Sequence, residues 1–361
     1  MLKYQNLLNH LTIEEKVKLI TSDERIKNKQ IKDYEFPSID FVDSLKDIVN
    51  DFIMPSYNSL GSVYDTNLIK EFGEKLGNYL ASINYNKIIN IPISPISDNN
   101  PNAFSSSRLV SARLGSNFAN GIENGGHFAS YGVLPGLSGI NLDSYFNDDL
   151  YSYKVAFSAY KPYASILSSS DAIDTLNGDY DFRGLKIVLA KNELDLKTAI
   201  NHKSSLSILD NKNNVELIIE AVNNYNKLKN QLAKGEISNE ALTSAISRGD
   251  AINPYTIDEI LDFLLDKLAH FEELTKKPAS FNFKELEEIE YRISQSSVIL
   301  LKNDNDILPI KRENKISFIG DQLFNPKFNT DKNVNINVLN IIDSYHLETV
   351  GVGHGYVKGQ E

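Results

Sequence analysis

The sequence predicts an α/β fold: a degenerate (β/α)8 barrel of the TIM type, a helical linker and the start of a truncated α/β sandwich domain. One observation is that short apolar segments alternate with amphipathic helical segments up to residue 209, which is typical of parallel strands joined by helices. Another is residues 182–190, where a glycine leads into an almost unbroken aliphatic run, as expected of a strand buried on both faces. From residue 215 to residue 270 the pattern becomes entirely helical.

The first helices are predicted from capping residues and apolar spacing. Thr12 and Glu15 form a capping box for a helix that runs through Ile20. Asp65 caps a longer helix, in which apolar residues recur every four positions from Leu68. Further helices are expected at 108–122, 148–160 and 194–200, and strands at 36–43, 87–96, 164–168, 182–190 and 206–209. Residues 125–128 are expected to form a strand or turn at the mouth of the barrel.

The second half of the chain begins with helices. Ser238 is predicted to start one, Thr256 and Glu259 form a capping box for another, and Asn282 caps a third that ends near residue 296. Strands are expected at 316–320 and 348–353. We therefore predict a barrel domain at 1–265, a helical linker at 266–314 and an incomplete sandwich domain at 315–361. The last segment is too short to form a doubly wound sheet by itself, so it is truncated or needs a partner.

The composition excludes several classes of function. The net charge of −11 repels the phosphates of nucleic acids and anionic membrane surfaces. The absence of cysteine rules out disulfides and thiolate sites and fits a cytoplasmic protein. The first residues lack the apolar run of a signal peptide, and no later segment has the length and apolarity of a membrane span. The six histidines show no paired metal-binding spacing, so neither a metal nor a cofactor is expected.

Five short motifs, in order along the chain, resemble those of the family 3 glycoside hydrolases, which include β-glucosidases and β-xylosidases. They are L-T-I-E-E-K-V at 11–17, P-S-I-D-F-V-D at 37–43, G-H-F-A-S-Y-G at 126–132, F-R-G at 182–184 before a strand, and V-I-L-L-K-N with a later L-P at 298–309. The resemblance implies a barrel that hydrolyses β-glycosides with retention. It also implies that Asp43 and His127 bind sugar hydroxyls.

The departures from this pattern fall on the residues that carry the chemistry. Counting from Gly184, the nucleophilic aspartate of the family is replaced by Leu189 and the neighbouring tryptophan by Ala190. Gly126 stands where the family has a lysine, and residues 97–102 lack the expected arginines. The family's S-E-D-P becomes S-S-S-R at 105–108, and a tyrosine becomes Ser170. Leucine has no lone pair with which to attack the anomeric carbon, so no catalytic residue is intact at this position.

Four residues keep alternative interpretations. Asp43 is either a sugar ligand or a solvated carboxylate at a strand end, and His127 is either a sugar ligand or a histidine of the core. Glu193 is either a relocated nucleophile or, with more weight, the first residue of a helix near its positive end. Lys186, inside the buried run, is expected to reach the base of the barrel or to face a charged partner.

Three interpretations of function follow. The first is a homologue without catalysis that acts as a scaffold, a regulator or a weak carbohydrate binder, with a protein partner for the incomplete last domain. The second is an active β-glucosidase-type enzyme completed by another chain or by a longer gene product. The third is a fragment without function. Leu189 favours the first, whereas fold analogy alone favours the second.

Overall fold

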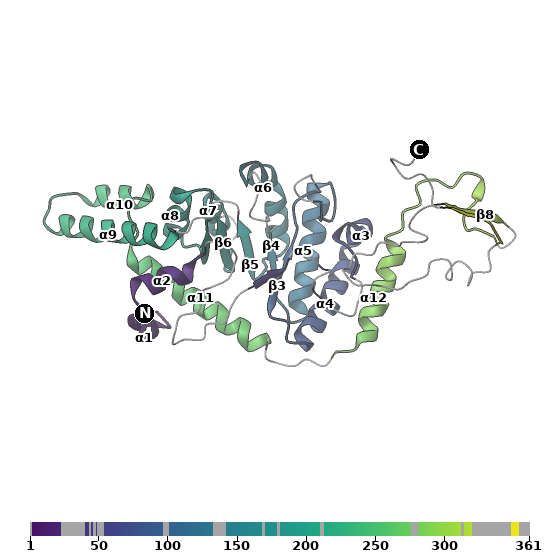
Figure 1. The fold of residues 1–361 in the computed structure, drawn as a ribbon, viewed down its shortest axis with the longest axis horizontal. Helices are drawn as coiled ribbons and strands as arrows, with labels where there is room; N and C mark the ends of the chain where they lie inside the picture. Colours follow the sequence, from purple (N-terminus) through teal and green to yellow (C-terminus); the bar gives the residue numbers. More distant parts are fainter. Residues whose placement is uncertain are drawn as a thin grey trace. The chain divides into compact units, whose positions relative to one another are not determined.

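A computed structural model of the chain describes residues 2–22, 40–42, 45, 48, 54–96, 101–132, 142–167, 170–178, 181–209, 213–275, 281–311, 314–319 and 348–353. The chain divides into two compact units, one of residues 1–44 and 57–297 and one of residues 45–56 and 298–361. The first unit contains the sheet and the helices around it (Figure 1). None of its described helices is long and apolar enough to cross a membrane.

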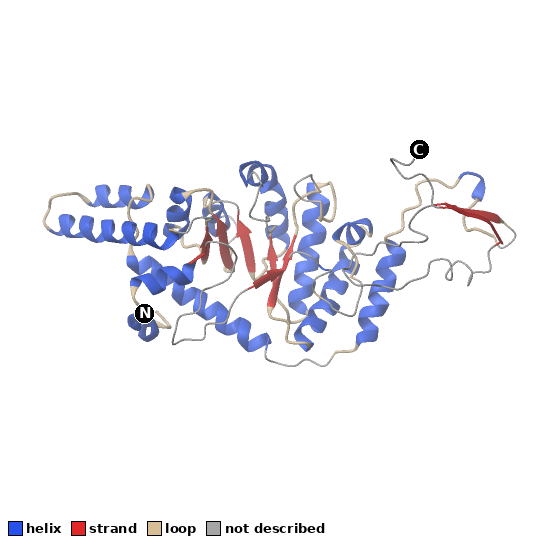
Figure 2. Ribbon diagram, in the orientation of Figure 1, coloured by secondary structure: helices blue, strands red, loops and turns tan. Residues whose placement is uncertain are grey.

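The first unit is built on a parallel sheet, whose strands are red in Figure 2. Its strand order is β1-β7-β6-β5-β4-β3-β2. Its strands are β1 (Thr21–Ser22), β2 (Asp40–Val42), β3 (Lys87–Ile91), β4 (Ala129–Tyr131), β5 (Ala164–Leu167), β6 (Leu185–Leu189) and β7 (Leu206–Ile208). From β2 to β7 each strand lies beside its successor, and β1 lies beside β7, which is the cyclic order of a barrel. A doubly wound sheet would reverse direction once. Within the described residues β1 and β2 are not paired, so the sheet is a barrel left open at one seam.

Connections that all step in one direction put the helices on one face of the sheet, because parallel crossovers are right-handed. The packing agrees. A Cβ atom built at Gly115 would lie 3.5 Å from a side-chain methyl of Ile91, and the ring of Tyr131 packs 5.2 Å from that of Phe157. Both helical residues belong to the connections after β3 and β4. The alternate residues, Asn90 and Ser130, therefore face the interior, where their side chains share a 2.9 Å hydrogen bond.

The helices around the sheet are bounded largely by the predicted caps. In the first unit they are α1 (Gln5–His10), α2 (Ile13–Ile20), α3 (Tyr57–Ser62), α4 (Thr66–Ser82), α5 (Arg108–Asn124), α6 (Leu142–Ala159), α7 (Asp171–Gly178), α8 (Glu193–Asn201), α9 (Asn214–Ala233), α10 (Asn239–Ser247), α11 (Pro254–Thr275) and α12 (Phe283–Ser296). The capping box of Thr12 and Glu15 is present, and Asp65, Ser238 and Asn282 each cap a helix. These sequence predictions are confirmed.

Glycines hold α4 and α5 side by side at very short range. Gly73 and Gly77 on α4 meet Gly121 on α5 and Gly125 at its end, and each pair is spaced four residues apart so that it lies on one helix face. A Cβ atom at Gly77 would lie 2.2 Å from the carbonyl oxygen of Ile122, and one at Gly121 would lie 2.1 Å from that of Lys70. The two backbones are thus in direct contact, which no larger residue permits.

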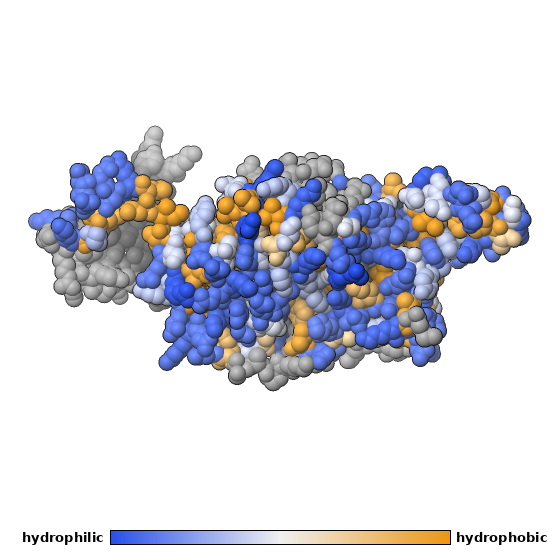
Figure 3. All heavy atoms as spheres, turned by 180° about the vertical axis from the view of Figure 1, so that it is seen from behind, coloured by the Kyte–Doolittle hydropathy of each residue, from blue (hydrophilic) through white to orange (hydrophobic). Residues whose placement is uncertain are grey.

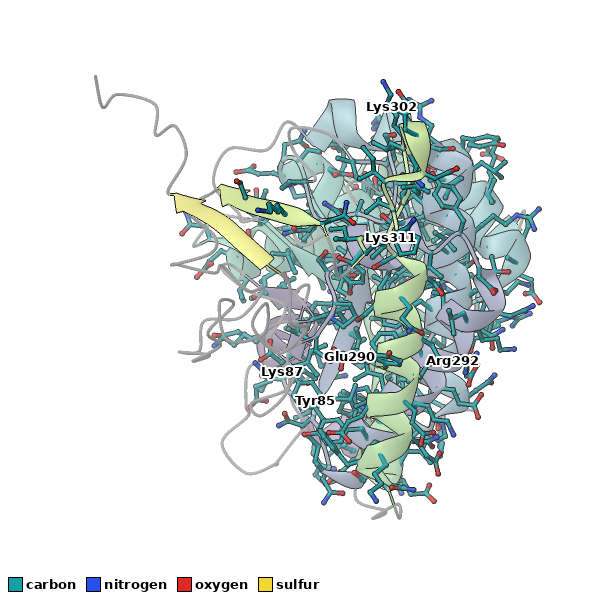
Figure 4. All side chains as sticks on the ribbon, turned by 90° about the vertical axis from the view of Figure 1, so that its right-hand side faces the viewer. Tyr85, Lys87, Glu290, Arg292, Lys302 and Lys311 are labelled. Atoms are coloured by element: carbon teal, nitrogen blue, oxygen red, sulfur yellow. The ribbon has the colours of Figure 1, made fainter. Side chains whose placement is uncertain are left out.

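Helix α12 returns to pack against α4. Lys75 on α4 pairs with Glu285, and Arg292 donates to Glu71 across 2.7 Å. Glu290 lies on the opposite side of α12 from Arg292 (Figure 4). Partial burial, with a smaller effect from Glu287, raises the pKa of Glu290 to about 7. The contacts of α12 with α4 and α3 explain why the first unit extends to residue 297.

The second unit contains a parallel pair of strands, β8 (Lys315–Ile319) and β9 (Glu348–Gly353), and a short 3-10 helix, η2 (Asp304–Asp306). Both strands were predicted. Between α12 and β8 the apolar side chains of residues 298–301, 307, 308 and 310 are exposed, and hydrophobic atoms gather on the surface of this segment (Figure 3). Within the described residues, these two strands are the whole sheet of the second unit.

Helix α11 differs from the sequence predictions in its bounds. The boundary after residue 265 falls inside α11, because this helix continues to Thr275 and its carboxylates bind α1, α2 and the turn after α8. The proposed capping box at Thr256 is wrong, since α11 already begins at Pro254 and Asn253 caps it by accepting from the backbone N–H of Tyr255 at 3.1 Å. Proline at the first helical position explains the earlier start.

A buried carboxylate joins α5 to the amino-terminal ends of β4 and β5. Glu123 Oε1 accepts from the backbone N–H groups of Tyr163 (2.6 Å) and Ala129 (3.2 Å), and its Oε2 accepts from the hydroxyl of Tyr160 (2.5 Å). Burial raises the pKa of Glu123 from 4.5 to about 7, although these hydrogen bonds act in the opposite direction. Glu123 is therefore a structural carboxyl that still holds much of its proton near neutral pH.

We expect Glu123 to make the fold less stable as the pH rises from about 4.5 to about 7. The native state then retains a proton that the unfolded chain has released, so its contribution is complete below the lower value and lost above the higher one. A pKa difference of this size corresponds to about 3 kcal/mol. Urea unfolding at several pH values should show a flatter profile for Glu123→Gln than for the unchanged chain. Because Glu290 titrates in the same range, the quantity to compare is the difference in unfolding free energy between the unchanged chain and Glu123→Gln at each pH. Identical pH profiles would contradict the raised pKa assigned to Glu123.

Candidate functional site

The carboxyl ends of parallel barrel strands form the edge at which barrel enzymes place their sites. The structure places Leu189 at this end of β6, as the sequence predicts, and the residue is only 5% exposed. Ser130 is paired in register with Ala164, and Ala164 with Leu185, so Leu185 lies on the interior face. Because side chains alternate along a strand, Leu189 lies on that face too.

The described interior neighbours of Leu189 at this edge carry no charge. Ile208 on β7 is paired in register with Leu189, and Ser22 on β1 is paired with Ile208. Ala190, which follows β6, is also buried. Among the described residues, this part of the edge is thus an apolar surface with one hydroxyl group beside it.

A carboxylate that the sequence patterns did not indicate lies at the same edge. Asp195, in the first turn of α8, accepts from the backbone N–H groups of Ser170 and Lys191, each at 2.9 Å. It thereby ties the turn after β5 to the turn after β6. Both oxygens are already engaged, so this carboxylate organises loops. Its position, six residues past Leu189 and in the first turn of a helix, is the sequence signal that could have identified it.

A second connection joins β1 to β7. The side-chain amide of Asn214, in the first turn of α9, donates to the carbonyl oxygens of Ser22 (3.0 Å) and Leu209 (2.8 Å). These two carbonyls end neighbouring strands. Asn214 thus fixes one end of the open barrel and gives the edge a buried amide group.

The expectation that His127 lies at the mouth of the barrel is wrong. Gly125 ends α5, Gly126 turns the chain with φ +86°, and β4 begins only at Ala129. His127 therefore lies at the amino-terminal end of the sheet, where its Nε2 contacts the carbonyl oxygen of Lys87 at 2.8 Å. It is 2% exposed, and burial lowers its pKa to about 4. This position favours the alternative of a core histidine.

Of the other residues singled out from the sequence, some are described by the structure and some are not. Glu193 is the first residue of α8 and is exposed, as expected for a helix start. Ser107, in the segment that replaces S-E-D-P, caps α5. Asp43 and residues 97–100 lie outside the described part of the structure, so their roles stay predictions.

The chemistry available at the described edge follows from these groups. A retaining glycosidase needs two carboxyl groups about 5–5.5 Å apart, one of them a nucleophile. Leu189 occupies the strand end, and Asp195 is held by two backbone N–H groups. Hydroxyl and amide groups can still bind a polar ligand by hydrogen bonds. Among the described residues, no group of three or more histidine, aspartate or glutamate side chains is arranged to hold a metal ion.

No family model matches the sequence. Among curated proteins, the chain is 22% identical to the thermostable β-glucosidase B of Acetivibrio thermocellus, an alignment that covers 94% of this chain and 47% of that protein. Among solved structures, it is similar to β-glucosidase 3B of Thermotoga neapolitana in complex with glycerol, with a TM-score of 0.66, 16% identity, and coverage of 96% of this chain and 55% of that one.

Two further solved structures show the same likeness. For the β-glucosidase of Kluyveromyces marxianus in complex with glucose, the TM-score is 0.66 at 16% identity, covering 100% of this chain and 47% of that one. For the GH3 β-glucosidase of Bifidobacterium adolescentis, it is 0.66 at 14% identity, covering 95% and 52%. The chain thus spans about half the length of each relative. It has the barrel fold of the family 3 β-glucosidases, and the resemblance predicted from its motifs is confirmed.

Proposed function

We propose that the chain is a family 3 glycoside hydrolase homologue that has lost hydrolysis and acts as a scaffold or a weak carbohydrate binder. The observation that carries this proposal is Leu189, a buried aliphatic side chain at the strand end where the family resemblance puts the nucleophile. Without a carboxylate there, no glycosyl-enzyme intermediate forms, and the rate enhancement that depends on it is lost. Acid–base groups elsewhere do not replace a missing covalent step.

The carbohydrate part of the proposal is supported by what the similar structures hold. The Kluyveromyces protein was solved with glucose and the Thermotoga protein with glycerol. A barrel of the same fold can keep hydroxyl-binding groups after its nucleophile is gone. In the predicted site, Asp43 supplies a carboxylate for two sugar hydroxyls, since charge-assisted hydrogen bonds are the strongest contacts available to it.

Glucose binding tests this part directly. Saturation-transfer NMR with the purified chain is expected to show saturable binding of glucose in the millimolar range, as for a site held by a few hydrogen bonds. Asp43→Ala should weaken it at least tenfold, because it removes a charged acceptor. The matched control is Asp250→Ala, which removes an exposed carboxylate paired with Arg248. Absence of binding, or equal binding by the two variants, would count against a sugar site at Asp43.

A second candidate is an active β-glucosidase completed by another chain or by a longer gene product. It is favoured by the exposed apolar segment of the second unit, which would suit a protein partner, and by the share of each relative that the chain covers. Leu189 argues against it, since adding a polypeptide does not change the end of β6. Turnover of aryl β-glycosides by the purified chain would contradict the first candidate, and turnover that appears only after a completing polypeptide is added would support the second.

A further inference from the structure

Two lysine side chains lie beside the same phenylalanine at the amino-terminal end of the barrel, away from the end that carries Leu189. Helix α11 crosses here, and its Phe271 packs 4.8 Å from Phe128, just before β4. The ammonium of Lys186, on β6, lies 5.8 Å from the ring centre of Phe263 on α11. The ammonium of Lys267, one helical turn further along, lies 5.5 Å from the same centre. Both ammonium groups thus lie near the same aromatic ring.

Four carboxylates of α11 do not compensate these charges, because they are engaged with other groups. Asp258 pairs with Lys16 of α2 at 2.7 Å, and Glu259 pairs with Lys203 at 3.2 Å. Asp262 accepts from the backbone N–H of Tyr4, and Asp266 pairs with Lys3. Within the described residues, neither Lys186 nor Lys267 forms an ion pair. The charged partner that the sequence suggested for Lys186 is therefore not found among the described residues. The charge of Lys267 does act on the buried carboxyl of Glu123, where it opposes the rise of the pKa, but the oxygens of Glu123 already accept from Tyr160, Tyr163 and Ala129.

Aromatic rings offset only part of the free-energy cost of burying these two charges. The Lys186 ammonium also lies 5.9 Å from the ring centre of Phe182, and that of Lys267 lies 5.8 Å from Tyr163, distances typical of cation–π contacts. Burial, and then repulsion from Arg183 and Lys267, lower the pKa of Lys186. Neutralising an unpaired, half-buried charge is favourable, so the arrangement attracts an anion.

We propose that Lys186 and Lys267 form a binding site for a small oxyanion with two negative charges, of the phosphate class. Two ammonium groups match the charge of a dianion, and lysine binds phosphate oxygens as a point charge. The surrounding rings of Phe182, Phe263 and Tyr163 limit the water that competes for it. The site lies at the amino-terminal ends of β5 and β6, so it does not depend on the proposed sugar site.

Thermal unfolding with inorganic phosphate tests the proposal. At constant ionic strength, replacing sodium chloride by phosphate at about ten times its dissociation constant is expected to raise the unfolding midpoint by about 3 °C. Acetate, a monoanion, should act only at much higher concentration. Lys186→Met and Lys267→Met keep the aliphatic stem and should each abolish the phosphate effect relative to their own baseline. The control is Lys154→Met, which alters an exposed lysine on α6 and should leave the effect unchanged.

The outcomes are distinguishable. A phosphate effect that both lysine variants lose and the control keeps supports the site. An effect that chloride reproduces at equal ionic strength, or one that survives in both lysine variants, overturns it. The unfolding midpoint of each variant with phosphate is compared with the midpoint of the same variant without phosphate. A change in baseline stability from removing a buried charge therefore does not affect the comparison. A change in glucose binding is not expected in either lysine variant.

Discussion

Replacing Gly121 by alanine is expected to lower the free energy of unfolding by more than about 3 kcal/mol. The added Cβ atom would lie 2.1 Å from the carbonyl oxygen of Lys70 and 2.9 Å from the backbone nitrogen of Glu74. Backbone atoms of α4 cannot move aside as a flexible side chain can, so the two helices must separate. Separation exposes Phe72 and Phe118, whose rings stack with centroids 5.8 Å apart between them.

Gly178→Ala is the matched control. A Cβ atom at Gly178, the last residue of α7, meets nothing within 4 Å, so its effect should stay within about 0.5 kcal/mol. Urea unfolding followed by circular dichroism measures both variants. Equal stability of the two would contradict direct backbone contact between α4 and α5.

Replacing Leu189 by aspartate is expected to cost about 3 kcal/mol or more at neutral pH. The introduced carboxylate would lie beside Ile208 in a layer where Leu189 is 5% exposed, and none of its described interior neighbours is a cation. Burial should raise the pKa of this carboxyl above its ordinary value. The loss of stability should then be smaller at low pH, where the group is protonated, and larger at high pH.

Leu189→Met, which keeps the volume and the apolar character, serves as the reference and should cost less than about 1.5 kcal/mol. Unfolding at pH 4.5 and pH 8 gives the comparison. If the aspartate variant matched the methionine variant at both values, the end of β6 would be open to water. The interior position assigned to Leu189 would then be incorrect.

The sequence patterns that predicted the fold are local and physically direct. Thr12, Asp65 and Asn282 were identified as caps because their oxygens satisfy free backbone N–H groups, and the structure confirms each of them. The apolar run ending at Leu189 was expected to be a strand buried on both faces. It forms β6, in which every side chain except that of Lys186 is buried. Such signals depend on neighbours a few residues away, so a single sequence carries them.

Features that depend on distant segments were not predictable in this way. His127 matched a family motif, but its location is set by where α5 ends and β4 begins, which two adjacent glycines determine. Asp195 connects turns that follow different strands, and the glycines of α4 and α5 matter only once the helices pack. Lys186 was recognised as unusual, yet the absence of a described acidic partner became visible only when the acids of α11 were seen bound elsewhere.

Turnover of aryl β-glucosides by the purified chain is the most direct test of the proposed loss of hydrolysis. The assay follows release of the chromogenic phenol at high protein concentration, with Asp43→Ala alongside as a control for contaminating glycosidase. We predict no release above background from either protein, because Leu189 offers no nucleophile at the end of β6. Release by the unchanged chain that disappears in the variant would contradict the account. It would then assign catalysis to a carboxylate at another position, with Glu193 as the first to replace.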